Sequence, residues 1–215
     1  PIINTAGTNS HTYVSAGNYV IEIDGSFTGY GWQTAVPTAS NVAAITGVTQ
    51  WNLVAGAPTL TSLRGAFSDH ANLMVVPDTL PPTVTSLRRM FRDAGSFNQD
   101  IGGWNTANVT GMSNMFRSAI SFNQDIGGWD TANVATMSHM FNDAPKFNQD
   151  LSSWDVSGVS AADSMQDMFL ASRLSVDNYD RLIANWNSGQ TLSSRDFHGG
   201  HSVFCATDPG VPDGG

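Results

Sequence analysis

The stretch FNQDIGGWNTANVTGMSNMF, from Phe97 to Phe116, recurs almost unchanged as FNQDIGGWDTANVATMSHMF, from Phe122 to Phe141. The two copies begin 25 residues apart, and a third copy opens with FNQDLSSWD at Phe147. A fixed period of roughly 20 to 50 residues marks a stack of structural repeats, each of which buries its apolar face only against its neighbours. The repetition therefore predicts stacked coils in which every layer needs the same residue at the same place.

Large apolar residues recur with the same period and would form columns through such a stack. These columns are Phe91, Phe116 and Phe141; Phe97, Phe122 and Phe147; Ile101, Ile126 and Leu151; and Trp104, Trp129 and Trp154. The third copy has three extra residues before its closing aromatic, Phe169. Worn copies upstream, LTSLRGAF ending at Phe67 and VTSLRRMF ending at Phe91, bring the total to about four to five units.

Each unit contains two kinds of segment. If FNQDI is extended, Phe97, Gln99 and Ile101 share one face. The apolar residues of NVTGMSNMF, from Val109 to Phe116, have a spacing close to a helical stripe. The sequence therefore predicts an α/β repeat fold: a leucine-rich-repeat-like solenoid of about four to five coils, with one short strand and one short helix or helical turn in each.

The ends of a repeat block need caps, because a terminal coil would otherwise expose its apolar side. The alternating segment TYVSAGNYVIEIDGSF, with a GN turn, predicts a β-rich N-terminal cap over 1–50. Residues Tyr179, Leu182, Ile183 and Trp186 have the i, i+3, i+4, i+7 spacing of an amphipathic helix. This helix would lie in a C-terminal cap over 171–205, with Ser175 or Asp177 as its N-cap.

The domain organisation follows from these segments. The repeat solenoid is expected over 51–170, with its clear repeats at 91–169, and the last residues, 206–215, have the composition of a linker. The chain begins abruptly at Pro1 without a signal peptide, so we expect a module excised from a longer protein with flanking domains.

Composition excludes several classes of partner. The net charge is −9 and Lys146 is the only lysine, so the sequence predicts no broad basic face. Nucleic acids and anionic membrane surfaces, which need such a face, are therefore not expected as partners. Cys205 is the only cysteine, which excludes an internal disulfide, and no apolar run reaches the roughly 18 residues of a membrane span. Only 13% of the residues are charged, and small polar side chains predominate, which is typical of extracellular modules.

The repeated Asn-Gln-Asp triplets are the most visible polar feature. The candidate ligand-binding residues on a concave ladder are Asn98, Asp100, Asn123, Asp125, Asn148 and Asp150. They could offer stacked amides and carboxylates to a ligand, or they could brace neighbouring coils by satisfying main-chain groups. The triplets are identical in all three repeats, which favours the brace, because every layer needs the same brace whereas a ligand site rarely repeats. Stacked carboxylates repel one another unless they are protonated, hydrogen-bonded or bridged by a cation, so Asp100, Asp125 and Asp150 are also candidate calcium ligands.

Two further sets carry alternative interpretations. The column Trp104, Trp129 and Trp154 could stack on sugars as aromatic contacts or belong to the core, and its layer position favours the core. The HGGHSVFC segment places His198, His201 and Cys205 close together in the sequence like transition-metal ligands, but no fourth ligand is evident. A structural segment in which Cys205 is a small buried thiol is therefore the favoured interpretation.

Some positions differ between otherwise identical units. Four arginines lie on the segments expected to be helical, and a solvated convex face is the simplest interpretation of them. They are Arg88, Arg89, Arg92 and Arg117. Other variable sets are Gly95, Ile120 and Pro145; Ser96, Ser121 and Lys146; and the pairs at 102–103, 127–128 and 152–153. A binding protein would diversify such positions, although drift gives the same pattern.

The repeat pattern MFxxAxxFNQDIxxWDTxNVTxMxxMF resembles that of BspA-like bacterial surface proteins with 25-residue leucine-rich-type repeats, which also occur in mycoplasma lipoproteins. The resemblance covers 84–205 and is strongest at 91–155. It implies an exported chain at the bacterial cell surface and a role in adhesion or host contact.

Together these observations predict an extracellular adhesion or ligand-binding module of a larger bacterial surface protein. It would bind protein or glycan on another cell through the solenoid surface. The alternative is a non-binding structural spacer or display domain of a long adhesin, with calcium as a candidate stabiliser. No catalytic motif is present, so we expect a protein that is not an enzyme.

Overall fold

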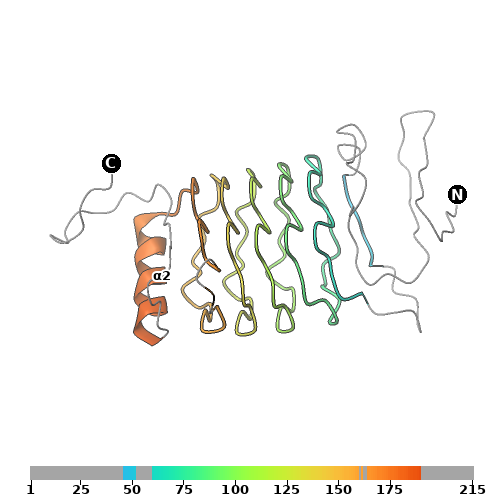
Figure 1. Ribbon diagram of the computed structural model, residues 1–215. Helices are drawn as coiled ribbons and strands as arrows, with labels where there is room; N and C mark the ends of the chain where they lie inside the picture. The colour runs from blue at the N-terminus through green and yellow to red at the C-terminus, as the bar shows by residue number, and fades with distance from the viewer. Residues whose placement is uncertain (1–45, 52–59, 160, 162–163, 190–215) are drawn as a thin grey trace, which may run out of the picture.

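The computed structural model describes residues 46–51, 60–159, 161 and 164–189. Most of the expected N-terminal cap, the end of the C-terminal cap and the linker at 206–215 lie outside these residues. Within them, successive repeats run side by side as a row of coils, and α2 (Val176–Gly189) closes one end of the row (Figure 1). Parallel β-bridges join Ser62 to Ser86, Ser86 to Gly111, and Gly111 to Thr136.

One segment of each coil carries the hydrogen bonds to the next coil, and we call it the ladder segment. The ladder segments of the first to fifth coils are 63–69, 87–93, 112–118, 137–143 and 165–171. Four bonds join the second coil to the third: Leu87 N to Gly111 O (2.9 Å), Arg89 N to Ser113 O (3.0 Å), Phe91 N to Met115 O (2.9 Å) and Asp93 N to Arg117 O (2.8 Å). Four equivalent bonds also join the first coil to the second, the third to the fourth and the fourth to the fifth.

The N–H groups between these donors close turns within the coil. Met90 N donates to Leu87 O at 3.1 Å, and Arg92 N donates to Arg89 O at 3.3 Å. Alternate N–H groups of a ladder segment therefore serve the next coil and the coil's own turn. This arrangement satisfies the main chain without regular secondary structure, as buried main-chain groups require.

Left-handed residues explain why the helical spacing of apolar residues does not produce a helix. Each ladder segment has two residues with positive φ, four positions apart. The first column is Gly65, Arg89, Asn114, His139 and Asp167, and the second is Asp69, Asp93, Ser118, Asp143 and Ala171. A left-handed residue interrupts both a right-handed helix and a strand. Within the described residues the coils thus consist of turns and single bridges, whereas a strand and a short helix per coil were expected.

The apolar columns are buried and stack from coil to coil. The rings of Phe91 and Phe116 lie 5.5 Å apart, and those of Phe116 and Phe141 lie 5.6 Å apart. Within a coil, the Phe116 ring also stacks on Phe122 at 3.9 Å. Stacked aromatic pairs contribute about 0.5–1.5 kcal/mol each beyond the burial of their area, so the columns add to the main-chain ladder.

The helix expected near the C-terminus forms α2. Its Leu182 and Trp186 side chains are fully buried, and Ile183 packs against the same core. Ser175 is the N-cap, because its Oγ accepts a hydrogen bond from Asn178 N at 3.3 Å. Asp177 lies in the first turn, where a carboxylate favours the positive end of the helix dipole.

One buried histidine departs from the repeat pattern. His70 is 1% exposed and takes the place that Ala94, Ala119 and Ala144 hold in later coils. Burial lowers the pKa of His70 below its usual 6.5, because the charged imidazolium loses its hydration there. The folded chain therefore keeps this side chain neutral at pH values where an unfolded chain would protonate it.

We expect His70→Ala to reduce the acid sensitivity of the fold. In the native chain the free energy of unfolding is retained above about pH 6.5 and decreases as pH falls below it, because only the unfolded state gains the proton. Denaturant unfolding of both proteins between pH 5 and pH 8 measures this slope. The variant should be less stable at pH 8 but should lose less stability on acidification. Equal slopes would contradict the assignment.

Gly102 lies where the next coil comes closest. A Cβ at Gly102 would lie 2.5 Å from the carbonyl oxygen of Asp125, whereas a Cβ at Gly103 would meet nothing within 4 Å. We expect Gly102→Ala to lower the free energy of unfolding by about 1–3 kcal/mol through overpacking, and the control Gly103→Ala to change it by less than about 0.5 kcal/mol. Denaturant unfolding would contradict the close contact if the two variants behaved alike.

Candidate functional site

The asparagines of the repeated triplets join neighbouring coils. Asn98 Oδ1 accepts a hydrogen bond from Asn123 N at 2.8 Å, and Asn123 Oδ1 accepts one from Asn148 N at 2.8 Å. Asn148 Oδ1 accepts the equivalent bond from Ser175 N at 2.7 Å. Each side-chain oxygen thus satisfies a main-chain N–H of the next layer, as the brace interpretation requires.

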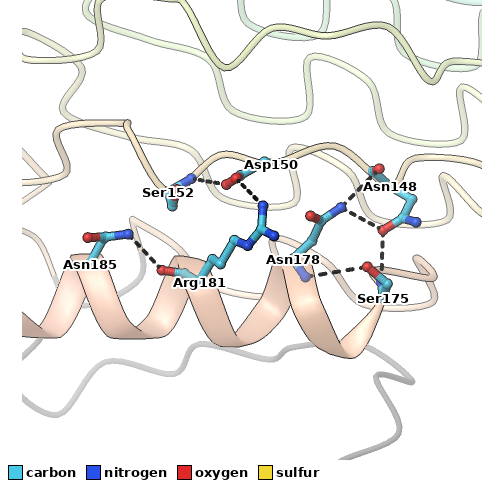
Figure 2. Close-up of polar contacts among 7 residues, drawn as sticks. All are labelled: Asn148, Asp150, Ser152, Ser175, Asn178, Arg181 and Asn185. Atoms are coloured by element: carbon cyan, nitrogen blue, oxygen red, sulfur yellow. Dashed lines mark hydrogen bonds and ion pairs between the residues drawn. The ribbon is translucent and has the colours of Figure 1, made fainter.

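The helical cap reproduces the contacts of a missing coil. Gln149 Nε2 donates to both O and Oδ1 of Asn123, each at 2.9 Å. On the last repeat, Asn178 Nδ2 of α2 donates to O and Oδ1 of Asn148 at 3.1 and 3.0 Å (Figure 2). Together with the bond from Ser175 N, α2 therefore presents to Asn148 the donors that a further coil would have presented.

The aspartates of the triplets brace their own turns. Asp100 Oδ1 accepts from Gly102 N, and Asp125 Oδ1 accepts from Gly127 N, both at 2.9 Å. Asp150 Oδ1 accepts from Ser152 N at 2.9 Å, and its Oδ2 lies 3.3 Å from Arg181 Nη1 of α2 (Figure 2). The hydrogen bonds from Ser152, followed by the weaker influence of Arg181, lower the pKa of Asp150.

The candidate calcium ligands do not converge. Among residues 46–51, 60–159, 161 and 164–189, no group of three or more His, Cys, Asp or Glu side chains is placed to hold a metal ion. The oxygens of Asp100, Asp125 and Asp150 that face their own turns are committed to main-chain donors. The second metal candidate, His198, His201 and Cys205, lies outside the described residues.

The tryptophan column lies inside the stack. Trp104, Trp129 and Trp154 are at most 3% exposed. The Nε1 of Trp129 donates to Ile101 O of the preceding repeat at 3.1 Å, and the other two tryptophans also donate to a main-chain carbonyl about one repeat earlier. With ring faces stacked on neighbouring tryptophans at 6.3–6.5 Å, the column offers no free aromatic surface for a sugar.

The variable glycine pairs have a structural explanation. Like Gly102, Gly127 lies against the next coil, since an added Cβ would be 2.7 Å from Asp150 O. The third copy has Ser152 at this position, where α2 follows instead of a coil of the same shape. The change from glycine to serine therefore marks the end of the stack and not a recognition surface.

Five arginines lie on the ladder segments of the first three coils, where the side chains of Arg64, Arg88 and Arg89 are exposed and those of Arg92 and Arg117 are half-buried. The four that the sequence singled out, Arg88, Arg89, Arg92 and Arg117, lie on the ladder segments of the second and third coils. Arg64 of the first coil joins them and was missed, although it occupies the place of Arg88 in the worn copy LTSLRGAF. Burial and then the charges of Arg64, Arg92, Arg88 and Arg117 lower the pKa of Arg89.

Residues 61–186, more than half of the chain, match the family described as "Mycoplasma protein of unknown function, DUF285", and the chain belongs to this family. No curated protein and no solved structure matches the chain. In the part of the chain that the structure describes, no helix has the length and hydrophobicity needed to cross a membrane.

Asp125→Asn separates a turn brace from a calcium ligand. The amide oxygen can accept the bond from Gly127 N as the carboxylate does, so we expect the free energy of unfolding to change by less than about 1 kcal/mol. The control Asp125→Ala removes the acceptor and should cost about 0.5–2 kcal/mol. Thermal unfolding with calcium and with EDTA should give the same Tm for each protein. A calcium-induced rise in Tm that Asp125→Asn abolishes would contradict the turn brace.

Proposed function

We propose that this member of the DUF285 family is an extracellular adhesion or ligand-binding module of a larger bacterial surface protein. It binds protein or glycan on another cell through side chains exposed on its coils. The repeat block acts as a leucine-rich-repeat-like solenoid, a rigid scaffold on which the exposed residues can vary. The finer likeness to BspA-like surface proteins is part of this proposal and rests on the repeat pattern at 84–205, which is strongest at 91–155.

One observation carries the proposal: the residues that repeat and the residues that vary have different roles. The repeated asparagines, aspartates, phenylalanines and tryptophans are engaged within the stack. The variable ladder positions instead hold exposed side chains, among them Arg64, Arg88 and Arg89. A spacer needs only the first kind of residue, whereas a binding module also needs the second kind.

Binding fits these coils better than catalysis does. A hydrolytic pair of carboxyl groups needs two environments that push the two pKa values apart. The carboxylates of Asp100 and Asp125 each accept one main-chain bond in the same turn of successive repeats, so their surroundings are alike. Such a uniform row supports a scaffold role for these groups.

The alternative is a structural spacer or display domain of a long adhesin. It is favoured by the way α2 satisfies Asn148, because a stack closed by its own helix is a stable unit without any ligand. The two proposals differ in whether the exposed surface of the isolated chain recognises anything.

Binding of the fluorescently labelled chain to panels of eukaryotic and bacterial cells tests the proposal. We expect saturable binding that excess unlabelled chain displaces, and equal binding with calcium and with EDTA because the described aspartates do not form a cation site. A chain of equal size and net charge without repeats serves as the control. Absence of displaceable binding to every cell type would contradict the adhesion proposal and favour the spacer.

A further inference from the structure

We propose that the five arginines on the ladder segments of the first three coils form a binding surface for the sulfate or carboxylate groups of a linear anionic polysaccharide. This inference rests on the proposed adhesion function and gives it a ligand class. We call the five residues the arginine surface: Arg64, Arg88, Arg89, Arg92 and Arg117.

The arginine surface spans three neighbouring coils. Arg64 and Arg88 hold the same place in the first and second ladder segments, and Arg92 and Arg117 hold the same place in the second and third. The phenylalanine rings of these coils stack at 5.8 and 5.5 Å, which sets the spacing between layers. Each pair of arginines therefore lies at the same place on two adjacent coils, one layer apart.

Little acidic charge neutralises this surface. Among the described residues, one ion pair involves any of the five arginines. It joins Arg92 Nε to Asp93 Oδ2 at 2.8 Å. The three ladder segments that bear the arginines contain five arginines and two aspartates, Asp69 and Asp93, whereas residues 118–189 contain nine aspartates and three lysine or arginine residues. An acidic chain thus carries a local basic surface at one end of its repeats, where a field of opposite sign can attract anions.

Arg89 is held at this surface against two unfavourable effects. Its φ is 58°, in the left-handed region that disfavours a bulky side chain. The other coils place Gly65, Asn114, His139 and Asp167 there, and glycine, asparagine, aspartate and histidine are the residue types that tolerate this region best. Arg89 is also repelled by the four surrounding arginines. Strain combined with like-charge repulsion is typical of a residue retained for function.

The chemistry of the surface favours a polysaccharide over a peptide. Guanidinium groups form paired hydrogen bonds with planar or tetrahedral oxyanions such as carboxylate and sulfate. Repeated rows of guanidinium groups suit a polymer with repeated anionic groups. Peptide recognition also requires pockets or anchors for apolar side chains. The exposed large apolar residues in the described part of the chain, Met74, Val75, Ile120 and Leu170, all lie outside the three ladder segments that bear the arginines.

Binding of the full chain to immobilised polysaccharides tests the inference. The probes are heparin, which carries sulfate and carboxylate, hyaluronan, which carries carboxylate alone, and uncharged dextran. The variants are Arg89→Asn, which copies Asn114 of the next coil, and the control Arg173→Asn, which removes an exposed arginine outside the surface.

We expect the native chain and Arg173→Asn to bind heparin with equal affinity and to bind it more weakly at high salt. Neither protein should bind dextran. Arg89→Asn should bind about tenfold more weakly, as expected for one lost charge-assisted contact. It should also melt roughly 2–4 °C higher, because strain and repulsion are relieved. Binding to hyaluronan as strong as to heparin would assign carboxylate as the recognised group, and binding to heparin alone would assign sulfate.

Three results would overturn the inference. These are equal heparin binding by the two variants, a lower Tm for Arg89→Asn than for the native chain, and tighter binding to a DNA oligonucleotide than to both anionic polysaccharides. Cell binding that neither Arg89→Asn nor soluble heparin weakens would overturn this inference and leave the adhesion proposal standing. Arg89-dependent heparin binding without any cell binding would support the arginine surface and overturn the adhesion proposal.

Discussion

Main-chain hydrogen bonding between coils is the interaction on which the described structure depends. A ladder segment sends alternate N–H groups to the next coil, as Arg89 N does to Ser113 O, and has no regular helix or strand to satisfy them otherwise. Every coil must therefore lie at the same spacing as its neighbours. Stacked phenylalanines, glycine at the closest approach and asparagine oxygens that accept from the next layer all follow from that spacing. The near-identity of the repeats is a consequence of this constraint.

The constraint also determines how the stack ends. Asn148 of the fourth coil would lack the partners that the next repeat provides to the equivalent asparagines, and α2 with its N-cap Ser175 supplies them from Asn178 and Ser175. A helix satisfies its own main chain, so it can close the row without a coil beyond it. Arg181 of α2 meets Asp150 at the same boundary, and an exposed ion pair of this kind adds little stability.

The sequence predicted the layers of the fold better than their local conformation. Period and residue type identified the buried phenylalanine and tryptophan columns and the α2 helix, because burial of large apolar residues leaves a direct pattern. The spacing of apolar residues from Val109 to Phe116 predicted a helical segment, and this prediction was wrong. Asn114 has a positive φ, and that conformation depends on pairing between coils, which no local pattern reveals. The same reason left two interpretations of Asn98 and Asp100 open until their hydrogen-bond partners were known. Arg64 was not predicted as part of the arginine set because its repeat, LTSLRGAF, has diverged from the clear copies.

A scaffold held by its repeated residues leaves its variable residues free for recognition, and this division underlies both proposals for function. Its premise is that pairing between coils holds the repeat block, and amide hydrogen exchange followed by NMR tests that premise most directly. Arg89 is exposed and Asn114 and His139 are half-buried, yet the N–H groups of all three donate to the next coil. We expect these amides to exchange at least about a thousandfold more slowly than in an unstructured chain. Exchange of all three at unstructured rates would contradict pairing between coils as the basis of the repeat block.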